Sequence, residues 1–154
     1  MSTSNHFDIC VMGLGYIGLP TASIFATKGK KVLGVDVQQR LVDTINQGKI
    51  HIEEPDLDIL VRAAVQSGNL SAATAPAPAG TFIIAVPTPF EKQNDGSLKP
   101  DLSYIESAVK AIAPVVKKGD LIILESTSPV GTTELIRDWL VEATKGRVEV
   151  NDLL

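Results

Sequence analysis

The stretch that decides the fold is FDICVMGLGYIG, which runs from Phe7 to Gly18. Its first half, Phe7 to Met12, is a short apolar run of the kind that forms a buried strand. Its second half spaces three glycines as G-x-G-x-x-G, at Gly13, Gly15 and Gly18. Between a strand and a helix, the first glycine permits a tight turn and the second lets the backbone approach a pyrophosphate. The third lets the helix pack closely on the strand, so the stretch predicts a dinucleotide-binding turn.

The next predicted strand, Lys31 to Val35, ends directly before an acidic residue, Asp36. A carboxylate at the end of the second strand is the group that accepts hydrogen bonds from the adenine ribose of a dinucleotide. Its negative charge would repel a 2′-phosphate, so the sequence favours NAD over NADP as the cofactor. The alternative is a structural glycine turn followed by an incidental aspartate, which the strand–helix pattern on both sides disfavours.

Apolar runs alternate with amphipathic stretches along the rest of the chain, as is typical of a parallel sheet covered by helices. We therefore expect residues 1–154 to form one α/β domain, a Rossmann-like, doubly wound, mostly parallel sheet with helices on both faces. Further strands are expected at residues 70–74, 82–86, 121–124 and 147–150, and helices at residues 19–28, 38–46, 56–66, 101–113 and 132–144. The polar segment Pro87 to Pro100 is expected to be an irregular functional loop.

The helix boundaries carry their own expectations. Asp56 and Asp101 are candidate N-caps, and either Ser128 or Thr132 is a candidate cap for the last helix. Gly29 stands where the first helix should end. On that helix, we expect three side chains to face the sheet, namely Ala22, Phe25 and Ala26.

Two segments rich in Ser, Thr and Pro follow strands at the sheet edge where the ligand of such a fold binds. They are Val86-Pro87-Thr88-Pro89 and Glu125-Ser126-Thr127-Ser128-Pro129. Their hydroxyls are candidates for contacts to ribose, phosphate or the nicotinamide amide. Ser, Thr and Pro are also good turn formers, so the residues alone leave both interpretations open.

Composition argues against several classes of protein. A net charge of −4 disfavours a nucleic-acid surface, which needs clustered Lys and Arg. No apolar run has the length of a membrane span, and we find no secretory signal, so we expect a cytoplasmic protein. The single cysteine, Cys10, is interpreted as a buried apolar residue of the first strand. His6 and His51 lack the spacing of metal ligands, and no metal site is expected.

These segments together closely resemble the UDP-glucose/GDP-mannose dehydrogenase family. The resemblance is carried by GLGYIGLP (13–20), GVD (34–36), INQGKIHIEEPDL (45–57), IAVPTPF (84–90), DLSYIESA (101–108) and ILESTSPVGTTE (123–134). They occur in the family's order and spacing, which makes them far more specific than the glycine motif alone. Within the family they look most similar to the branch that oxidises UDP-N-acetyl-D-mannosamine.

The resemblance implies an NAD-dependent, two-step oxidation of the C6 alcohol of UDP-N-acetyl-D-mannosamine to the uronate. Two hydrides would pass to two NAD molecules, with a thioester on a cysteine between the steps. The motif and the resemblance together give the expected cofactor-binding residues: Gly13, Gly15, Tyr16, Ile17, Gly18, Asp36, Val86, Thr88, Ser126, Thr127 and Thr133. UDP-glucose or UDP-N-acetylglucosamine are alternative substrates. A stand-alone NAD-binding module and a β-hydroxyacid dehydrogenase are alternative functions, the latter disfavoured by the long segment after Val86.

The resemblance covers only the N-terminal part of a family member and fades after Trp139. The nucleophilic cysteine, the other residues of the active centre and the nucleotide-sugar domain have no counterpart here. We therefore expect an NAD-binding fragment with no catalytic residue of its own. A full-length member is expected to be a homodimer, with NAD and a nucleotide sugar as its ligands.

Overall fold

The structure, a computed structural model, describes residues 6–153. Its centre is a five-stranded sheet in the order β3-β2-β1-β4-β7, and all four strand pairings are parallel. The strands are β1 (Phe7–Met12), β2 (Val32–Val35), β3 (Leu70–Ala73), β4 (Ala79–Ile84) and β7 (Leu121–Leu124). The chain runs outward from β1 to β3, then crosses to the other side of β1 for β4 and β7. The point where the strand order reverses therefore lies between β1 and β4.

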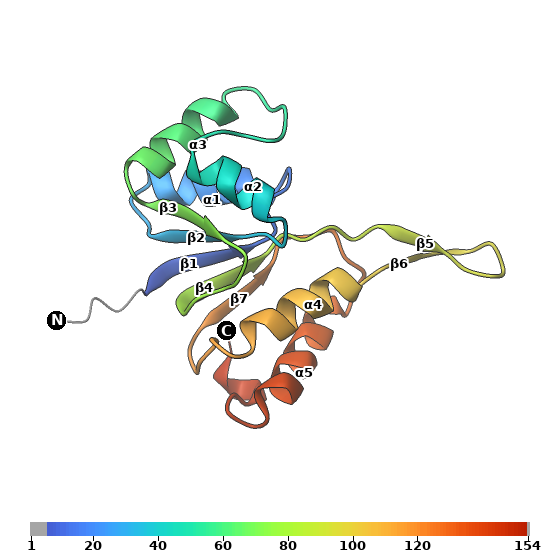
Figure 1. Cartoon of the computed structure of the whole chain (residues 1–154). Helices are drawn as coiled ribbons and strands as arrows, with labels where there is room; N and C mark the ends of the chain where they lie inside the picture. The colour runs from blue at the N-terminus through green and yellow to red at the C-terminus, as the bar shows by residue number, and fades with distance from the viewer. Residues whose placement is uncertain (1–5, 154) are drawn as a thin grey trace.

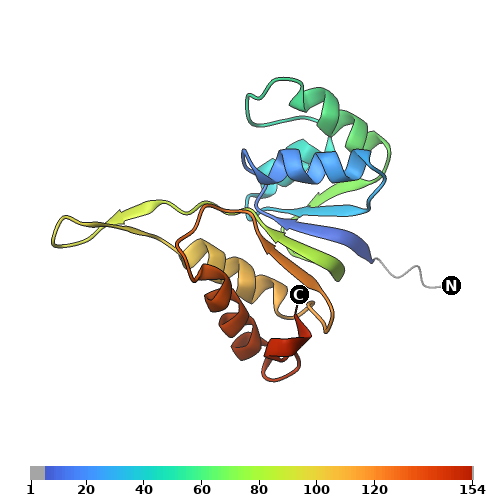
Figure 2. The ribbon, with the colours of Figure 1, turned by 180° about the vertical axis from the view of Figure 1, so that it is seen from behind.

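Helices cover both faces of the sheet, as Figures 1 and 2 show from opposite sides. One layer contains α1 (Gly18–Thr27), α2 (Gln39–Asn46) and α3 (Leu57–Gln66), and the other contains α4 (Ser103–Ile112) and α5 (Thr132–Thr144). The predicted doubly wound α/β fold is thereby confirmed. None of the helices within residues 6–153 combines the length and the apolarity needed to cross a membrane.

The central strand β1 sends alternate side chains to the two layers. Ile9 and Val11 are buried against the layer of α1, α2 and α3, whereas Cys10 and Met12 are buried against α4 and α5. A strand that is covered on both faces reads as a continuous apolar run, and this explains why ICVM is apolar at every position.

The residues predicted to face the sheet can be compared with the buried residues of α1 and α4. On α1 the buried stripe is Leu19, Ala22, Ser23 and Ala26, which follows the i, i+3, i+4, i+7 spacing of one helix face. Phe25 lies outside that stripe and is 37% exposed, so its predicted contact with the sheet is wrong. The predicted inward residues of α4 are all buried: Ile105, Ala108, Val109 and Ile112.

The helix caps differ from most of the expectations. Asp56 does occupy the N-cap position of α3, but its backbone is left-handed, with a φ of 62°, and its side chain makes no cap hydrogen bond. Gly131, with a φ of 90°, is the N-cap of α5, and the Thr132 hydroxyl donates instead to the carbonyl of Pro129. The Asp101 carboxylate does accept the N–H of Ser103 at 2.8 Å, although Leu102 takes the N-cap position itself.

The β4 strand begins three residues earlier than expected, at Ala79, and ends at Ile84. Ala79 pairs with Phe7, the first residue of β1, and this pairing extends β4 toward its N-terminal end. Val86 consequently lies in the loop after the strand rather than in it.

The segment Pro87 to Pro100 was predicted to be irregular, but this prediction is wrong because the segment contains an antiparallel hairpin. Its strands are β5 (Phe90–Lys92) and β6 (Leu98–Pro100), and they project away from the rest of the molecule (Figures 1 and 2). Gly96 has a φ of +84° in the turn, where the Asp95 carboxylate accepts the N–H and O–H of Ser97. An Asp-Gly pair is a hairpin signal, and it was present in the sequence.

The sixth strand predicted at residues 147–150 is absent from the described chain, where a short 3₁₀ helix, η1 (Val150–Asp152), takes its place. Asp152 accepts the Glu149 N–H and forms an ion pair with Lys118 at 2.7 Å. These contacts close the segment into a turn, which overrides the strand preference of its valines.

Candidate dinucleotide-binding site

The glycine turn is held tightly against the end of β4. Gly13 has a φ of +92°, and a Cβ there would lie 2.7 Å from the carbonyl oxygen of Ala85. A Cβ on Gly18 would lie 1.9 Å from the carbonyl oxygen of Gly13. Both positions therefore exclude any side chain, and the predicted roles of these two glycines in the tight turn and in helix packing are confirmed.

Gly15 and the start of α1 form an open cradle at the same turn. A Cβ on Gly15 would have no atom within 4 Å, so the turn is not closed over by protein at this point. The N-cap residue Ile17 makes no side-chain cap hydrogen bond, and the first turn of α1 contains no acidic residue. Tyr16 and Ile17 are 64% and 53% exposed beside it. The N–H groups and the dipole of a helix N-terminus attract an anion, and a pyrophosphate fits these features.

The carboxylate of Asp36 is fixed beside this cradle by two backbone groups. One oxygen accepts the N–H of Leu14 at 3.1 Å, and the other accepts the N–H of Gln38 at 3.1 Å. Each carboxylate oxygen keeps a further lone pair, with which it can accept a ribose hydroxyl. The bond to Leu14 joins β2 to the glycine turn, and no spacing rule indicated it.

His51, which sequence reasoning did not connect with Asp36, lies close to the same carboxylate. It belongs to the segment between α2 and α3. Partial burial lowers its pKa below the ordinary 6.5, while the charge of Asp36 and the backbone of Leu14 act in the opposite direction. The imidazole is therefore mostly neutral at pH 7. No group of three His, Cys, Asp or Glu side chains that could hold a metal ion occurs within residues 6–153.

A cavity of about 270 Å³ opens beside Asp36 at the carboxyl ends of the strands. Its lining comes from the ends of β1, β2, β3 and β4 and from α4: Met12, Gly13, Val35, Asp36, Val37, Gln38, Thr74, Pro76, Val86, Pro87, Tyr104, Ser107, Ala108 and Ala111. Apolar walls next to a carboxylate suit a flat aromatic base such as adenine. Sequence reasoning found three of these residues, Gly13, Asp36 and Val86, and missed the wall supplied by α4.

The two predicted hydroxyl segments meet each other across the ends of β4 and β7. The Thr88 hydroxyl donates to the carbonyl of Thr127 at 2.7 Å, and the Ser126 hydroxyl donates to the carbonyl of Val86 at 2.6 Å. These bonds show that the side chains stabilise turns. The turns lie at the sheet edge where a ligand would bind, so a role in ligand contact also stays open.

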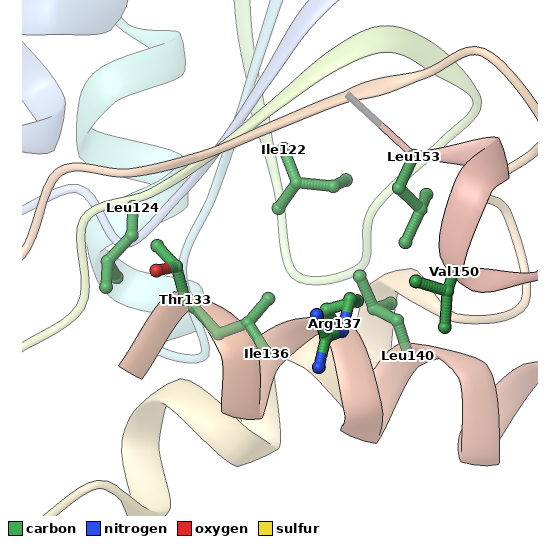
Figure 3. A pocket seen from close by; sticks show the side chains of 8 residues that line it. All are labelled: Ile122, Leu124, Thr133, Ile136, Arg137, Leu140, Val150 and Leu153. Carbon is green, nitrogen blue, oxygen red and sulfur yellow. The ribbon is translucent and has the colours of Figure 1, made fainter. Parts of the chain in front are cut away.

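Thr133 lies apart from the cavity beside Asp36. It lies on the first turn of α5, at the end of a separate groove of about 320 Å³ between β7, α5 and η1 (Figure 3). Apolar side chains dominate that groove, which also contains Arg137. The structure thus brings Gly13, Asp36 and Val86 together but leaves Thr133 in a different environment.

Comparison with known proteins agrees with this geometry. Residues 7–152 match the model of the UDP-glucose/GDP-mannose dehydrogenase family, NAD binding domain. The chain belongs to this family. The family match spans nearly the whole chain and indicates NAD as the cofactor, in agreement with the prediction from Asp36.

Two curated relatives show how far the likeness of this dehydrogenase-family domain extends. A protein of Ralstonia nicotianae named NDP-N-acetyl-D-galactosaminuronic acid dehydrogenase is 64% identical over 132 residues, which are 86% of this chain and 30% of that protein. The UDP-N-acetyl-D-mannosamine dehydrogenase of Campylobacter jejuni is 62% identical over 139 residues, 90% of this chain and 33% of that protein. The chain therefore spans about a third of the length of these relatives.

A solved structure of the family has the same fold. The UDP-N-acetyl-mannosamine dehydrogenase of Staphylococcus aureus matches with a TM-score of 0.83 and 39% identity, over 94% of this chain and 34% of that one. The predicted resemblance to the family, including its mannosamine branch, is confirmed by these matches.

Proposed function

We propose that this chain is the NAD-binding part of an enzyme that oxidises the C6 alcohol of UDP-N-acetyl-D-mannosamine to the uronate with two NAD. Bound NAD would supply the hydride acceptor. The residues of this chain bind and orient it: the turn Gly13 to Gly18 and the start of α1 hold the pyrophosphate, and Asp36 holds the adenine ribose. Tyr16, Ile17 and the predicted hydroxyl residues are proposed as further contacts.

The observation that carries the proposal is the direct bond between the Asp36 carboxylate and the Leu14 N–H of the glycine turn. It holds this carboxylate next to an open helix N-terminus and an apolar cavity of about 270 Å³, which supports the roles proposed for Asp36 and the glycine turn. Adenine, ribose and pyrophosphate are linked in this order in NAD, so three adjacent features fit three adjacent parts of one ligand.

The binding claim is tested by titrating the chain with NADH and following cofactor fluorescence. We expect a saturable signal, and folded protein without one at millimolar NADH would overturn the proposal. Asp36→Asn should reduce the preference for NAD over NADP, because the repulsion of a 2′-phosphate is lost. Asp43→Asn, on the exposed side of α2, changes the net charge equally and should leave the preference unchanged.

We further propose that the chain by itself does not turn over a nucleotide sugar. Its one cysteine, Cys10, is fully buried in β1, and burial raises the pKa of its thiol to about 12. A nucleophilic thiol needs the opposite, namely access and a lowered pKa. The chain mixed with NAD and UDP-N-acetyl-D-mannosamine should therefore produce no NADH absorbance.

A second candidate substrate follows from the Ralstonia relative, whose name refers to N-acetyl-D-galactosaminuronic acid. UDP-N-acetyl-D-mannosamine and UDP-N-acetyl-D-galactosamine should be compared as substrates of the protein that the whole gene encodes, and the larger kcat/KM decides. Thr133 as a cofactor contact, a homodimer of the full-length enzyme and a cytoplasmic location stay predictions.

A further inference from the structure

Glu125 is joined to a helix from which it is distant in sequence. It directly follows β7, where its N–H donates to the carbonyl of Ile84 at 2.9 Å. One of its carboxylate oxygens accepts the hydroxyl of Thr21 at 2.8 Å, across 104 positions of sequence. Thr21 lies on α1, the helix whose N-terminus faces the proposed pyrophosphate position. The Glu125 side chain is therefore oriented by the same helix that would hold the cofactor.

The topology places this carboxylate on the nicotinamide side of the site. In a doubly wound sheet a dinucleotide lies across the point where the strand order reverses, here between β1 and β4. Asp36 at the end of β2 marks the adenosine side, so the other half extends over the ends of β4 and β7. Glu125 is the first residue after β7.

The charge of Glu125 is not neutralised by a basic side chain of the described chain. The three ion pairs found between described side chains link other residues, on α4, on α5 and at η1. Glu125 is also exposed, and a single exposed hydrogen bond contributes little to stability. An oriented, unpaired carboxylate near a ligand matters mainly through its charge.

We propose that Glu125, oriented by Thr21, makes the site favour the oxidised cofactor over the reduced one. The inference rests on the proposed function. The ring of NAD⁺ is cationic and that of NADH is neutral, while the pyrophosphate and the adenosine are the same in both. A nearby carboxylate attracts only the cationic ring, so it changes the ratio of the two affinities. Glu125 thus selects the redox state of the ligand through its charge, and Thr21 is the positioning residue that orients it.

The test compares dissociation constants for NAD⁺ and NADH, measured by calorimetry on the chain and its variants at low ionic strength. Glu125→Gln should weaken NAD⁺ binding by about three- to tenfold and leave NADH binding within about twofold, as expected when one carboxylate charge attracts only the cationic ring. Thr21→Val keeps the charge but frees the side chain, and should shift the ratio by about twofold. Glu125→Asp should retain most of the wild-type ratio.

Glu142→Gln is the matched control, since it removes the same charge from the last turn of α5 and should leave the ratio unchanged. If Glu125→Gln reduced the affinities for NAD⁺ and NADH equally, Glu125 would have only a structural role, and the inference would be overturned. An unchanged ratio would overturn it as well. Failure of the wild-type chain to bind either ligand would instead overturn the proposed function itself, together with this inference. Thermal unfolding of each variant shows that it is folded.

Discussion

Helix α1 packs on one face of the sheet mainly through small residues, whereas α4 and α5 pack on the other face with larger side chains. Gly18, Ala22 and Ala26 lie on the buried side of α1, whereas Ile112 of α4 and Leu140 of α5 are buried in the other layer. The second layer keeps a groove of about 320 Å³ between β7, α5 and η1, with Leu140 among the residues shown in Figure 3.

The two layers also differ in how far they reach across the sheet. On β7, Ile122 and Leu124 face the second layer. Leu121 and Ile123 face the side of the first layer, where they are 36% and 38% exposed. The first layer thus ends before β7, and the glycine turn lies where Gly13 and Gly18 leave no room for a Cβ. Backbone contacts therefore define the glycine side of the site, while side-chain hydrogen bonds between the loops after β4 and β7 shape the other side.

Gly18→Ala should have the largest effect, because its new Cβ would lie 1.9 Å from the Gly13 carbonyl oxygen. We expect a loss of at least about 3 kcal/mol of unfolding free energy, measured by urea titration. Gly15→Ala is the control, since its Cβ meets no atom within 4 Å; it should cost less than about 1 kcal/mol but weaken NADH binding. Equal stability losses in both variants would contradict a turn defined by backbone contact.

Alkaline pH should weaken the second layer through Cys10. Burial raises the pKa of its thiol from 9.0 to about 12, so the unfolded chain releases this proton at a lower pH than the folded chain. The stabilising contribution is complete below pH 9 and is lost as the pH rises toward 12. At pH 10.5 the loss of unfolding free energy amounts to about 2 kcal/mol. Cys10→Ala should show a correspondingly smaller decline in unfolding free energy between pH 8 and pH 10.5, and an identical decline would contradict it.

Thr88→Val removes the hydroxyl that donates to the Thr127 carbonyl at 2.7 Å. Loss of one partly exposed hydrogen bond should cost about 1 kcal/mol, measured by thermal unfolding. NADH affinity should fall as well, because the loops after β4 and β7 lose their tie. Thr27→Val, on the far end of α1, removes an exposed hydroxyl that bonds only within its own helix and should keep wild-type affinity.

Ile123→Lys should have the smallest effect on stability, within about 0.5 kcal/mol, since the side chain is already 38% exposed. It should nevertheless reduce self-association at high protein concentration, because a charge on an open apolar strand opposes pairing with another copy. Light scattering over a concentration series measures this. A strong loss of stability would show that the uncovered end of the first layer is packed after all.

Several elements could be predicted because local sequence and tertiary packing agree. The strand Phe7–Met12, the glycine turn and the start of α1 follow from the run of apolar residues and from three glycine positions. The inward face of α4 follows from helical spacing alone. Asp36 was found because a carboxylate at the end of the second strand has one recurrent use in this fold.

Other features depend on contacts between distant residues, which local pattern does not contain. The valines of VEV at 148–150 favour a strand, but the ion pair between Asp152 and Lys118 and the reciprocal bonds of Glu149 and Asp152 hold a turn. The bond from Leu14 to Asp36 spans 22 positions, and the bond from Thr21 to Glu125 spans 104. No periodicity signals such pairs in a single sequence.

The hairpin of β5 and β6 stands clear of both helix layers, with five of its six strand residues exposed (Figure 2). Its tip at Asp95-Gly96 can therefore lengthen at only the entropic cost of a longer loop, about 0.6 kcal/mol for each doubling. Insertions there would leave the sheet and the glycine turn untouched. The reach of this arm is thus a property that can change independently of the fold, and it offers a place to insert a reporter group without disturbing the binding site.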